Sequence, residues 1–259
     1  MDFEHILYEV REDGIAVVTL HRPHRLNALN GPIMRELEEA VRAIEADPAV
    51  RVWLLTGAPR PDGRPCFGAG ADVQAIAEGD GPGEITGFHL CNDIDDLLKP
   101  SIAVIDGVCT TGAVELALCC DFRLVAPSAQ ISDWHLKKLG TGLGGWGGST
   151  RWSRLVGTTH TKEIILTGKV VDGEEAVRIG FASAVHPSDE LMEAALEMAG
   201  RITQMNPDGV ALTLAHLDRN RDMSRDQALR WAQLAPRWLG VSTSMEGKEG
   251  RVLASKKDQ

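Results

Sequence analysis

The sequence predicts an α/β fold built on a mostly parallel sheet. Short apolar runs rich in β-branched residues, at 15–20, 52–56 and 102–105, are typical of buried strands. Between the first two runs lies a segment, 33–44, whose apolar residues follow the helical repeat. Strands that alternate with helices usually pair in parallel, because the helices form the crossovers. The alternation continues to about residue 126, so a parallel sheet is expected over this part of the chain.

The first helix has recognisable ends. We expect it to begin at Asn30, with Pro32 near its first position, and to end before Pro48. Its apolar residues lie at helical spacing, which gives it one face for the core: Ile33, Leu37, Val41 and Ile44. The loop that precedes it, 21–30, is held extended before Pro23.

Residues 101–122 form the segment around which the rest of the chain is organised. A buried strand at 102–105 breaks at Asp106-Gly107 and leads past Gly112 into an apolar helix at 114–120. Glu115 lies in the first turn of that helix. A carboxylate among apolar neighbours is costly unless it is paired or protonated, so Glu115 needs a structural partner or a chemical role.

A second glycine-rich turn lies upstream, at 65–72, between the strand at 52–56 and a short predicted helix. The N–H groups of Ala71 and Gly112 both stand at such turns, where small residues let a ligand approach the backbone. Two N–H donors that converge on one carbonyl oxygen form an oxyanion hole, and one such donor contributes roughly 3 to 4 kcal/mol to catalysis. Taken singly, each turn is more often an ordinary connection between strand and helix.

The later part of the chain is predicted to be mainly helical. Residues 78–87 contain four glycines and a proline, which favours a mobile loop at the mouth of the site, before a helix at 85–98. Asp172 and Glu175 form a capping box for another helix, and an apolar stripe runs through 188–204.

The overall composition argues against several classes of protein. A formal net charge of −10 and a pI near 5.3 disfavour general nucleic-acid binding, which needs a basic surface. No apolar run reaches the about 18 residues of a membrane span, and residues 1–14 lack the apolar stretch of a secretory signal. The five cysteines have no framework spacing, so we expect reduced core thiols of a cytoplasmic protein.

Three stretches of the chain resemble the enoyl-CoA hydratase/isomerase (crotonase) superfamily. They are CFGAGADV at 66–73, KPSIAVIDGVCTTGAVELALCCDFRLVA at 99–126 and TGKVVDGEEAVRIGFASAVHP at 167–187. HRPHRLNALN at 21–30 is similar to the opening turn of that family, and SMEGKEGRVLASKK at 244–257 to its closing helix. The resemblance covers essentially the whole chain in order. It identifies the superfamily well and the individual reaction poorly.

The resemblance also implies a domain organisation. Residues 1–190 would form a ββα spiral core that carries the acyl-CoA site, and 191–259 a C-terminal helical region that mediates oligomerisation and covers the site. Homotrimers and dimers of trimers are usual in the superfamily and are expected here. Lys248, Lys256 and Lys257 would offer cations to the phosphates of coenzyme A, although each is equally an ordinary solvated lysine.

By the same resemblance, the substrate is an acyl-CoA thioester. Coenzyme A would enter as part of that substrate, with no tightly bound cofactor and no metal ion. Glu115 would move the proton, and the N–H groups of Ala71 and Gly112 would hold the thioester oxygen. The substrate-binding residues implied by the motifs are Arg25, Ala28, Ala69, Ala71, Asp72, Val73, Gly112 and Trp134.

The segment 128–152 departs from the hydratase pattern. Hydratases of the superfamily carry a second glutamate here, opposite the one that matches Glu115, and this sequence has none. Counting forward from Ala129 places His135 at that position, whereas counting back from Gly147 places Lys137 there. His135 suits the role of second acid or base, since its ordinary pKa is close to neutrality. Asp133 is a weaker alternative, and the position is also compatible with no second acid at all.

Several functions therefore remain open at the level of sequence. The first is an enoyl-CoA hydratase-like enzyme, and the alternatives are an acyl-CoA isomerase, a hydrolase that uses His135, or a catalytically reduced acyl-CoA-binding protein. The loop length also resembles the dihydroxynaphthoyl-CoA synthase branch, but that branch has an Asp in place of Leu143 and no glutamate at Glu115. Trp134 and Trp146 would be able to wall a wide pocket for a bulky acyl group.

Overall fold

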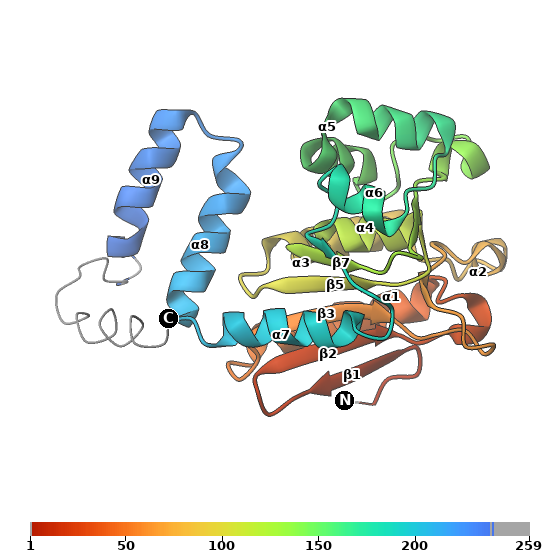
Figure 1. Ribbon diagram of the computed structural model, residues 1–259, viewed down its shortest axis with the longest axis horizontal. Coiled ribbons are helices and arrows are strands. Elements are labelled where there is room, and N and C mark those ends of the chain that lie inside the picture. Colours follow the sequence, from red (N-terminus) through yellow and green to blue (C-terminus); the bar gives the residue numbers. More distant parts are fainter. Residues whose placement is uncertain (1, 239, 241–259) are drawn as a thin grey trace. The chain divides into compact units, whose positions relative to one another are not determined.

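The computed structural model describes residues 2–238 and 240. In this part of the chain the larger sheet has the strand order β1-β2-β3-β5-β7-β9, in which β1 runs antiparallel to β2 and all other neighbours are parallel (Figure 1). Its strands are β1 (Ile6–Val10), β2 (Ile15–Leu20), β3 (Val52–Gly57), β5 (Ser101–Ile105), β7 (Phe122–Val125) and β9 (Ala184–Val185). The parallel sheet expected from the alternation of strands and helices is confirmed.

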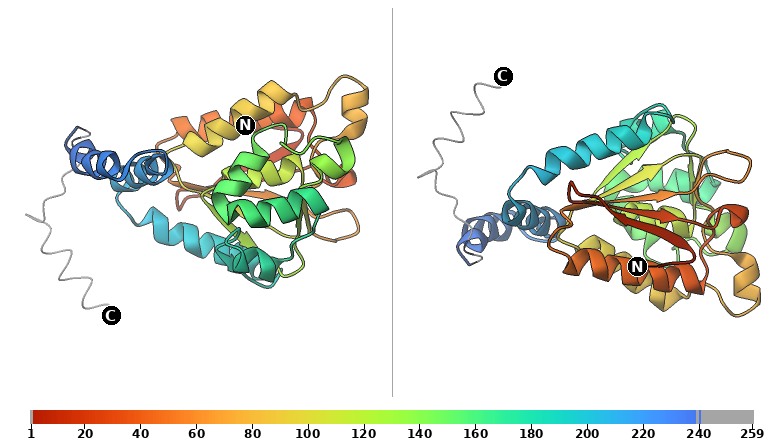
Figure 2. Two further views of the ribbon diagram at one scale, coloured as in Figure 1. Left: turned by 90° about the horizontal axis from the view of Figure 1, so that it is seen from above. Right: turned by 90° about the horizontal axis from the view of Figure 1, so that it is seen from below.

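Both faces of this sheet are buried. On β2, Ala16, Val18 and Leu20 face one core and Ile15 faces the other, as the two-residue period of a strand requires. The first core is filled by α1 (Gly31–Ala46), α3 (Glu84–Asp96) and α4 (Gly112–Cys119), and the second by α7 (Leu191–Thr203). Figure 2 shows α1 and α3 on one side of the sheet and α7 on the other.

A smaller sheet, which the apolar pattern of the sequence did not indicate, positions the site. It consists of β4 (Cys66–Gly68), β6 (Val108–Thr110) and β8 (Gln130–Ser132), all parallel. These strands are only three residues long, which is too short for a recognisable period. Because the carboxyl ends of parallel strands meet at one edge of a sheet, the segments that follow β4, β6 and β8 lie together.

The remaining helical elements connect these sheets or follow them. Asn30 caps α1 by accepting from the Ile33 N–H at 3.2 Å, and Asp172 caps α6 by accepting from the Glu175 N–H at 2.9 Å, as predicted. The Glu175 carboxylate, which the predicted capping box would turn back to Asp172, accepts from Lys169 and Arg178 instead. The other elements are η1 (Pro23–Arg25), α2 (Val73–Ala77), the π-helical turn η2 (His135–Leu139), α5 (Gly148–Thr167), α6 (Gly173–Arg178), α8 (Pro207–Asn220) and α9 (Arg225–Trp238).

The chain divides into two compact units, one up to Met205 and one from Asn206 onward. The boundary expected from the resemblance lay after residue 190, which would have put α7 into the C-terminal region. In the structure α7 belongs to the first unit, because Leu191, Ala195 and Ala199 are buried against the larger sheet. The predicted closing helix at 244–257 and its lysines lie outside the described residues.

All five cysteines are free and buried. Within residues 2–238, none of the helices combines the length and the apolar character needed to cross a membrane.

Candidate active site

The edge of the small sheet opens onto a pocket of about 440 Å³. Ala71 follows β4, Gly112 and Glu115 follow β6, and His135 follows β8, and all four line this pocket. The four residues predicted as catalytic are therefore brought together from three separate stretches of sequence.

Two backbone N–H groups are left free at this pocket. The residues on either side of Ala71 are tied to Leu29, since the Leu29 N–H donates to the Gly70 carbonyl and the Asp72 N–H to the Leu29 carbonyl, both at 2.8 Å. The Ala71 N–H consequently points the other way. Gly112 is the first residue of α4, where N–H groups have no intrahelical acceptor. In the described part of the chain, neither N–H has a hydrogen-bond partner.

Thr111 joins the segments that carry these donors. Its backbone is strained, with φ 49° and ψ −122°, a conformation that costs a non-glycine residue of the order of 1 to 3 kcal/mol. Its N–H donates to the Ser132 carbonyl at 3.2 Å and its hydroxyl to the Ala69 carbonyl at 3.4 Å. These bonds hold Thr111 in the strained conformation and fix the start of α4 against both neighbouring segments.

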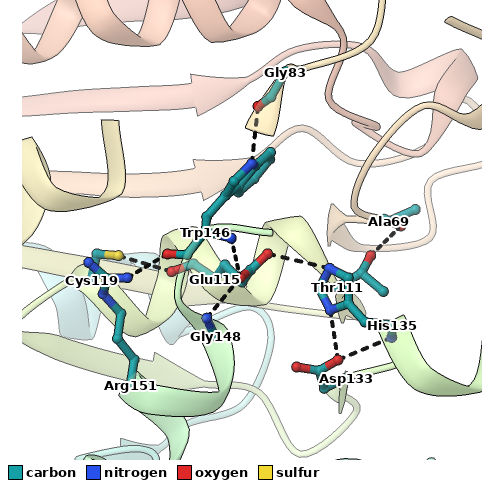
Figure 3. Close-up of polar contacts among 10 residues, drawn as sticks. All are labelled: Ala69, Gly83, Thr111, Glu115, Cys119, Asp133, His135, Trp146, Gly148 and Arg151. Atoms are coloured by element: carbon teal, nitrogen blue, oxygen red, sulfur yellow. Dashed lines mark hydrogen bonds and ion pairs between the residues drawn. The ribbon is translucent and has the colours of Figure 1, made fainter. Parts of the chain in front are cut away.

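Glu115 is only 1% exposed, and its two oxygens have different partners (Figure 3). Oε1 accepts the backbone N–H groups of Trp146 and Gly148, each at 2.9 Å. Gly144 has φ +76°, and a side chain there would overlap Oε1. Oε2 is the oxygen that faces His135, 3.4 Å from Nε2. Burial raises the pKa of Glu115 above its ordinary value, and the charge of His135 and the two N–H donors oppose that rise.

His135 is buried between two carboxylates. Its Nδ1 lies 2.8 Å from Oδ1 of Asp133, and the same oxygen accepts the His135 backbone N–H at 3.1 Å. Burial by itself would lower the pKa of the imidazole. The hydrogen bond with Asp133 and the charges of Asp133 and Glu115 outweigh burial, so the pKa of His135 is raised above its ordinary value. His135 therefore binds a proton more readily than a free imidazole does.

Trp146 forms a fixed wall of the pocket. Its ring lies against Gly112, where an added Cβ would come within 2.8 Å of Cζ3 and 2.9 Å of Cη2. It also lies against Gly87, where a side chain would overlap the ring. The indole N–H donates to the Gly83 carbonyl at 3.2 Å. The predicted wall residue Trp146 is thus at the pocket, directly beside the Gly112 N–H.

Arg151 holds the loop that carries Trp146. Its guanidinium donates to the Trp146 carbonyl at 2.6 Å, to Asp95 at 2.8 Å and to Asn92 at 2.8 Å. The loop from 144 to 148 is thereby fixed to α3 on one side and to Glu115 on the other. This places the two N–H donors that bind Oε1.

Six of the predicted substrate-binding residues lie outside the pocket lining. Asp72 caps α2 and pairs with Arg22 at 3.0 Å, while the carbonyl of Ala28 accepts from the same Arg22. The Val73 side chain is 70% exposed, so it would contact a ligand at the protein surface and not inside the pocket.

Trp134, expected to wall the pocket, points elsewhere. Its indole donates to the Gly168 carbonyl at 3.2 Å, and the ammonium groups of Lys137 and Lys138 lie over its ring. Arg25 donates to Gln74 at 2.8 Å on the surface, and Ala69 accepts the Thr111 bond described above. Whether Arg25 and Ala69 contact coenzyme A stays a prediction.

The forward count along 128–152 is the one that agrees with the structure. His135 faces Glu115, whereas Lys137 lies over Trp134. Sequence reasoning missed the backbone donors of Trp146 and Gly148 and the position of Asp133 behind the imidazole. The run of glycines between 140 and 148 was the available signal, since a loop so rich in glycine is suited to enclose another side chain.

No group of three or more His, Cys, Asp or Glu side chains suited to a metal ion is present among residues 2–238 and 240. The chemistry that the described pocket residues themselves offer is that of two free N–H donors, one carboxylate oxygen and one imidazole nitrogen. This set suits proton transfer beside a carbonyl group whose oxygen gains negative charge.

Comparison with known proteins agrees with this reading. The chain is 34% identical to a short-chain-enoyl-CoA hydratase of Clostridium acetobutylicum, over 98% of this chain and 95% of that protein. It is 34% identical to a crotonyl-CoA hydratase of Syntrophomonas wolfei, over 88% and 87%. A crystal structure of an enoyl-CoA hydratase from Bacillus anthracis matches with a TM-score of 0.86 at 26% identity, over 99% of this chain and 97% of that one.

These structural neighbours confirm the expected crotonase-like α/β fold. The profile of the enoyl-CoA hydratase/isomerase family matches residues 10–237, which is most of the chain. The chain therefore belongs to the enoyl-CoA hydratase/isomerase family, as the sequence motifs predicted.

Proposed function

We propose that this protein is an enoyl-CoA hydratase-like enzyme, which adds water to, or removes it from, the α,β double bond of an acyl-CoA thioester. The observation that carries the proposal is the meeting of Glu115 Oε2 and His135 Nε2, 3.4 Å apart, in the pocket that Ala71 and Gly112 line. Relatives named as hydratases support the reaction class. Coenzyme A is proposed as part of the substrate, with no tightly bound cofactor.

The N–H groups of Ala71 and Gly112 are proposed to form the oxyanion hole. The thioester oxygen gains negative charge as water adds to the β-carbon, and fixed donors stabilise that charge more strongly than the neutral carbonyl. Gly112 contributes the N–H at the start of α4, where the helix dipole also favours negative charge.

Glu115 and His135 would share the proton transfers. Oε1 of Glu115 is occupied by two N–H donors, which leaves Oε2 to take a proton from the attacking water. Protonated His135 would then give its Nε2 proton to the α-carbon, so that hydroxyl and hydrogen both come to the substrate. A proton passing from Oε2 to Nε2 would restore the resting pair.

Isomerisation of the double bond is the second candidate. Glu115 is the single carboxylate among the described residues that line the pocket, and one carboxylate is enough to carry a proton between two carbons. Hydrolysis of the thioester with His135 as base remains a third outcome of the test below.

Product analysis separates these reactions. Purified protein is incubated with crotonyl-CoA, and separately with 3-butenoyl-CoA, in water enriched in ¹⁸O. The products are separated by liquid chromatography and their masses are measured by mass spectrometry. Hydration is expected to add one labelled water to crotonyl-CoA with the thioester intact. Conversion of 3-butenoyl-CoA without a change of mass indicates isomerisation, and release of free coenzyme A indicates hydrolysis. Binding of both substrates without any product would contradict the enzymatic proposal.

The assembly is proposed on the family resemblance alone. A homotrimer or a dimer of trimers is expected, and light scattering of the purified protein measures its mass directly. Cytoplasmic location is expected from the composition and stays a prediction.

A further inference from the structure

Asp133 has no place in the proton transfers described above, yet it is the more deeply buried of the two acids beside His135. Its side chain is fully buried, with 0% exposure. Oδ1 accepts two N–H groups from one residue, the Nδ1–H of the His135 ring at 2.8 Å and the His135 backbone N–H at 3.1 Å. Oδ2 has no partner in the part of the chain that the structure describes. Burying a carboxylate costs free energy, and all the hydrogen bonds that Asp133 accepts come from one histidine, so its burial needs an explanation.

From this arrangement we propose that Asp133 is a positioning residue: it holds His135 in the tautomer that keeps the proton on Nδ1 and turns Nε2 toward Glu115. A carboxylate only accepts hydrogen bonds, so the nitrogen that faces it must carry a hydrogen. The other nitrogen, Nε2, is then the one that gains and loses a proton, at 3.4 Å from Oε2 of Glu115.

The second bond to Asp133 fixes the orientation of the whole residue. Because the backbone N–H and the ring N–H of His135 bind the same oxygen, the imidazole is held relative to its own main chain. His135 is also the first residue of the π-helical turn η2, and only Asp133 and Trp134 separate it from the short strand β8. Asp133 thus links the end of the strand, the start of the turn and the ring (Figure 3).

Among the described residues, the charged groups that face the imidazole are Asp133 and Glu115, from β8's end and from α4. The lysines of its own turn, Lys137 and Lys138, lie over the Trp134 ring instead. Two carboxylates around one imidazole favour its protonated form. Asp133 thereby makes His135 the proton donor and leaves Glu115 as the acceptor.

The tautomer is measured on the resting protein, without substrate. Long-range ¹H–¹⁵N correlation spectra of histidine-labelled protein distinguish neutral rings with hydrogen on Nδ1 from rings with hydrogen on Nε2, and His135→Gln identifies the signal among the eight histidines. We expect His135 to hold its hydrogen on Nδ1 and to titrate above its ordinary pKa. In Asp133→Asn the pKa is expected to fall by about one pH unit or more. A neutral ring with hydrogen on Nε2 in the wild type overturns the proposal, whether or not any variant folds.

The consequence for turnover rests on the proposed hydration. Asp133→Asn is expected to lower kcat about 10- to 100-fold, the range for side chains that orient an imidazole from behind, with KM within about twofold. The basic limb of the pH profile is expected to move to lower pH by the same amount as the His135 pKa. A purely structural role for Asp133 would leave that limb in place, and this outcome contradicts the proposal.

Asp121→Asn is the matched control. Asp121 is a partly buried acid that also binds the N–H and the hydroxyl of one residue, Ser101, at 2.7 Å and 2.6 Å, but it does not line the pocket. It is expected to lose stability without a change in the pH profile. If both variants lose the same kcat, Asp133 has no special role. If the wild type hydrates nothing and the His135 tautomer is as expected, the positioning role stands and the proposed reaction falls.

Discussion

Two segments supply the facing side chains Glu115 and His135 of the pocket, and they are held in place in different ways. Residues 101–122 run through β5, β6 and α4, where helix α4 is buried along its whole length. Residues 133–148 contain only the turn η2 and a glycine-rich loop, much of it half-buried or exposed. The first segment is fixed by the core, whereas the second is fixed by individual hydrogen bonds, two of which end on Glu115.

The comparison shows that Glu115 has two functions at once. Its Oε1 fastens the loop through Trp146 and Gly148, and its Oε2 faces the imidazole of His135. A carboxylate free to rotate would not serve both purposes. The loop therefore orients Glu115, and Glu115 orients the loop. Removal of Oε1 is expected to displace both the loop and the rest of the Glu115 side chain.

The largest expected effect comes from separating these two functions. Glu115→Gln keeps an oxygen for the two N–H donors but removes the proton acceptor. We expect kcat to fall by about 10²- to 10⁴-fold, the usual contribution of a general acid or base, while the acyl-CoA dissociation constant changes little. Steady-state kinetics and calorimetric binding measure the two quantities.

Glu115→Ala is the companion variant, since it also removes the oxygen that accepts the hydrogen bonds from the N–H groups of Trp146 and Gly148. Two buried N–H groups are then left unpaired, at a cost of about 1 to 3 kcal/mol each. It is expected to unfold at a lower temperature than Glu115→Gln and to bind acyl-CoA less tightly. Equal binding and stability for the two variants would show that Oε1 does not hold the loop. Unchanged turnover in Glu115→Gln would reject Glu115 as the proton acceptor.

The same contrast explains what the sequence was able to predict. Strands such as 15–20 and the apolar helix around Glu115 have a period or a continuous apolar run, so their burial and direction follow from pattern alone. Ala71 and Gly112 were found because each stands at the junction of such elements. The segment that carries His135 has no period, so its register follows only from the position of His135 opposite Glu115 in the structure.

What the sequence did not give are contacts between distant residues. Nothing local marks the N–H of Trp146 as a partner of Glu115, 31 residues away, because any residue offers the same N–H. Trp134 and Trp146 looked equivalent as wall residues. Only the packing separates them, since one ring lies on Gly112 and the other binds Gly168.

The second prediction concerns Gly112, where the two segments touch. In Gly112→Ala the new methyl group would lie within 2.8 Å of the Trp146 ring, and the same ring also packs against Gly87. Either the start of α4 or the loop must shift. A misplacement of about 1 Å costs roughly 10²-fold in rate, so we expect kcat/KM to fall by about 10- to 100-fold.

A double-mutant cycle tests the physical cause of this loss. Gly112→Ala combined with Trp146→Leu is expected to recover stability relative to Gly112→Ala alone, because the clash is relieved. Gly200→Ala is the control, since its Cβ in α7 would meet open space and the pocket is not involved. Strict additivity of the two substitutions would mean that the ring and the helix start are not coupled.

The smallest expected effect is the pH dependence of stability. Its sign depends on whether the folded protein favours the protonated or the ionised form of Glu115. Because the pKa of Glu115 is raised in the folded protein, the folded protein binds this proton more tightly than the unfolded chain does. The free energy of unfolding therefore falls as the pH rises from about 4.5 through the folded pKa. His135, whose pKa is also raised, acts in the same direction from about 6.5 upward. Glu115→Gln removes the first contribution and weakens the second.

The melting temperature of Glu115→Gln, relative to wild type, is therefore expected to rise between pH 5 and pH 8. For a chain of this size, about 1 kcal/mol corresponds to about 2–4 °C, which scanning calorimetry resolves. Glu39→Gln, an exposed position on α1, should show no such trend. If the relative melting temperature instead falls with pH, the bonds from Trp146, Gly148 and His135 outweigh burial and the buried carboxylate is held in its charged form. The N–H groups of the loop 144–148 would then stabilise Glu115 as an anion, so the loop would set the charge of Glu115 as well as its orientation.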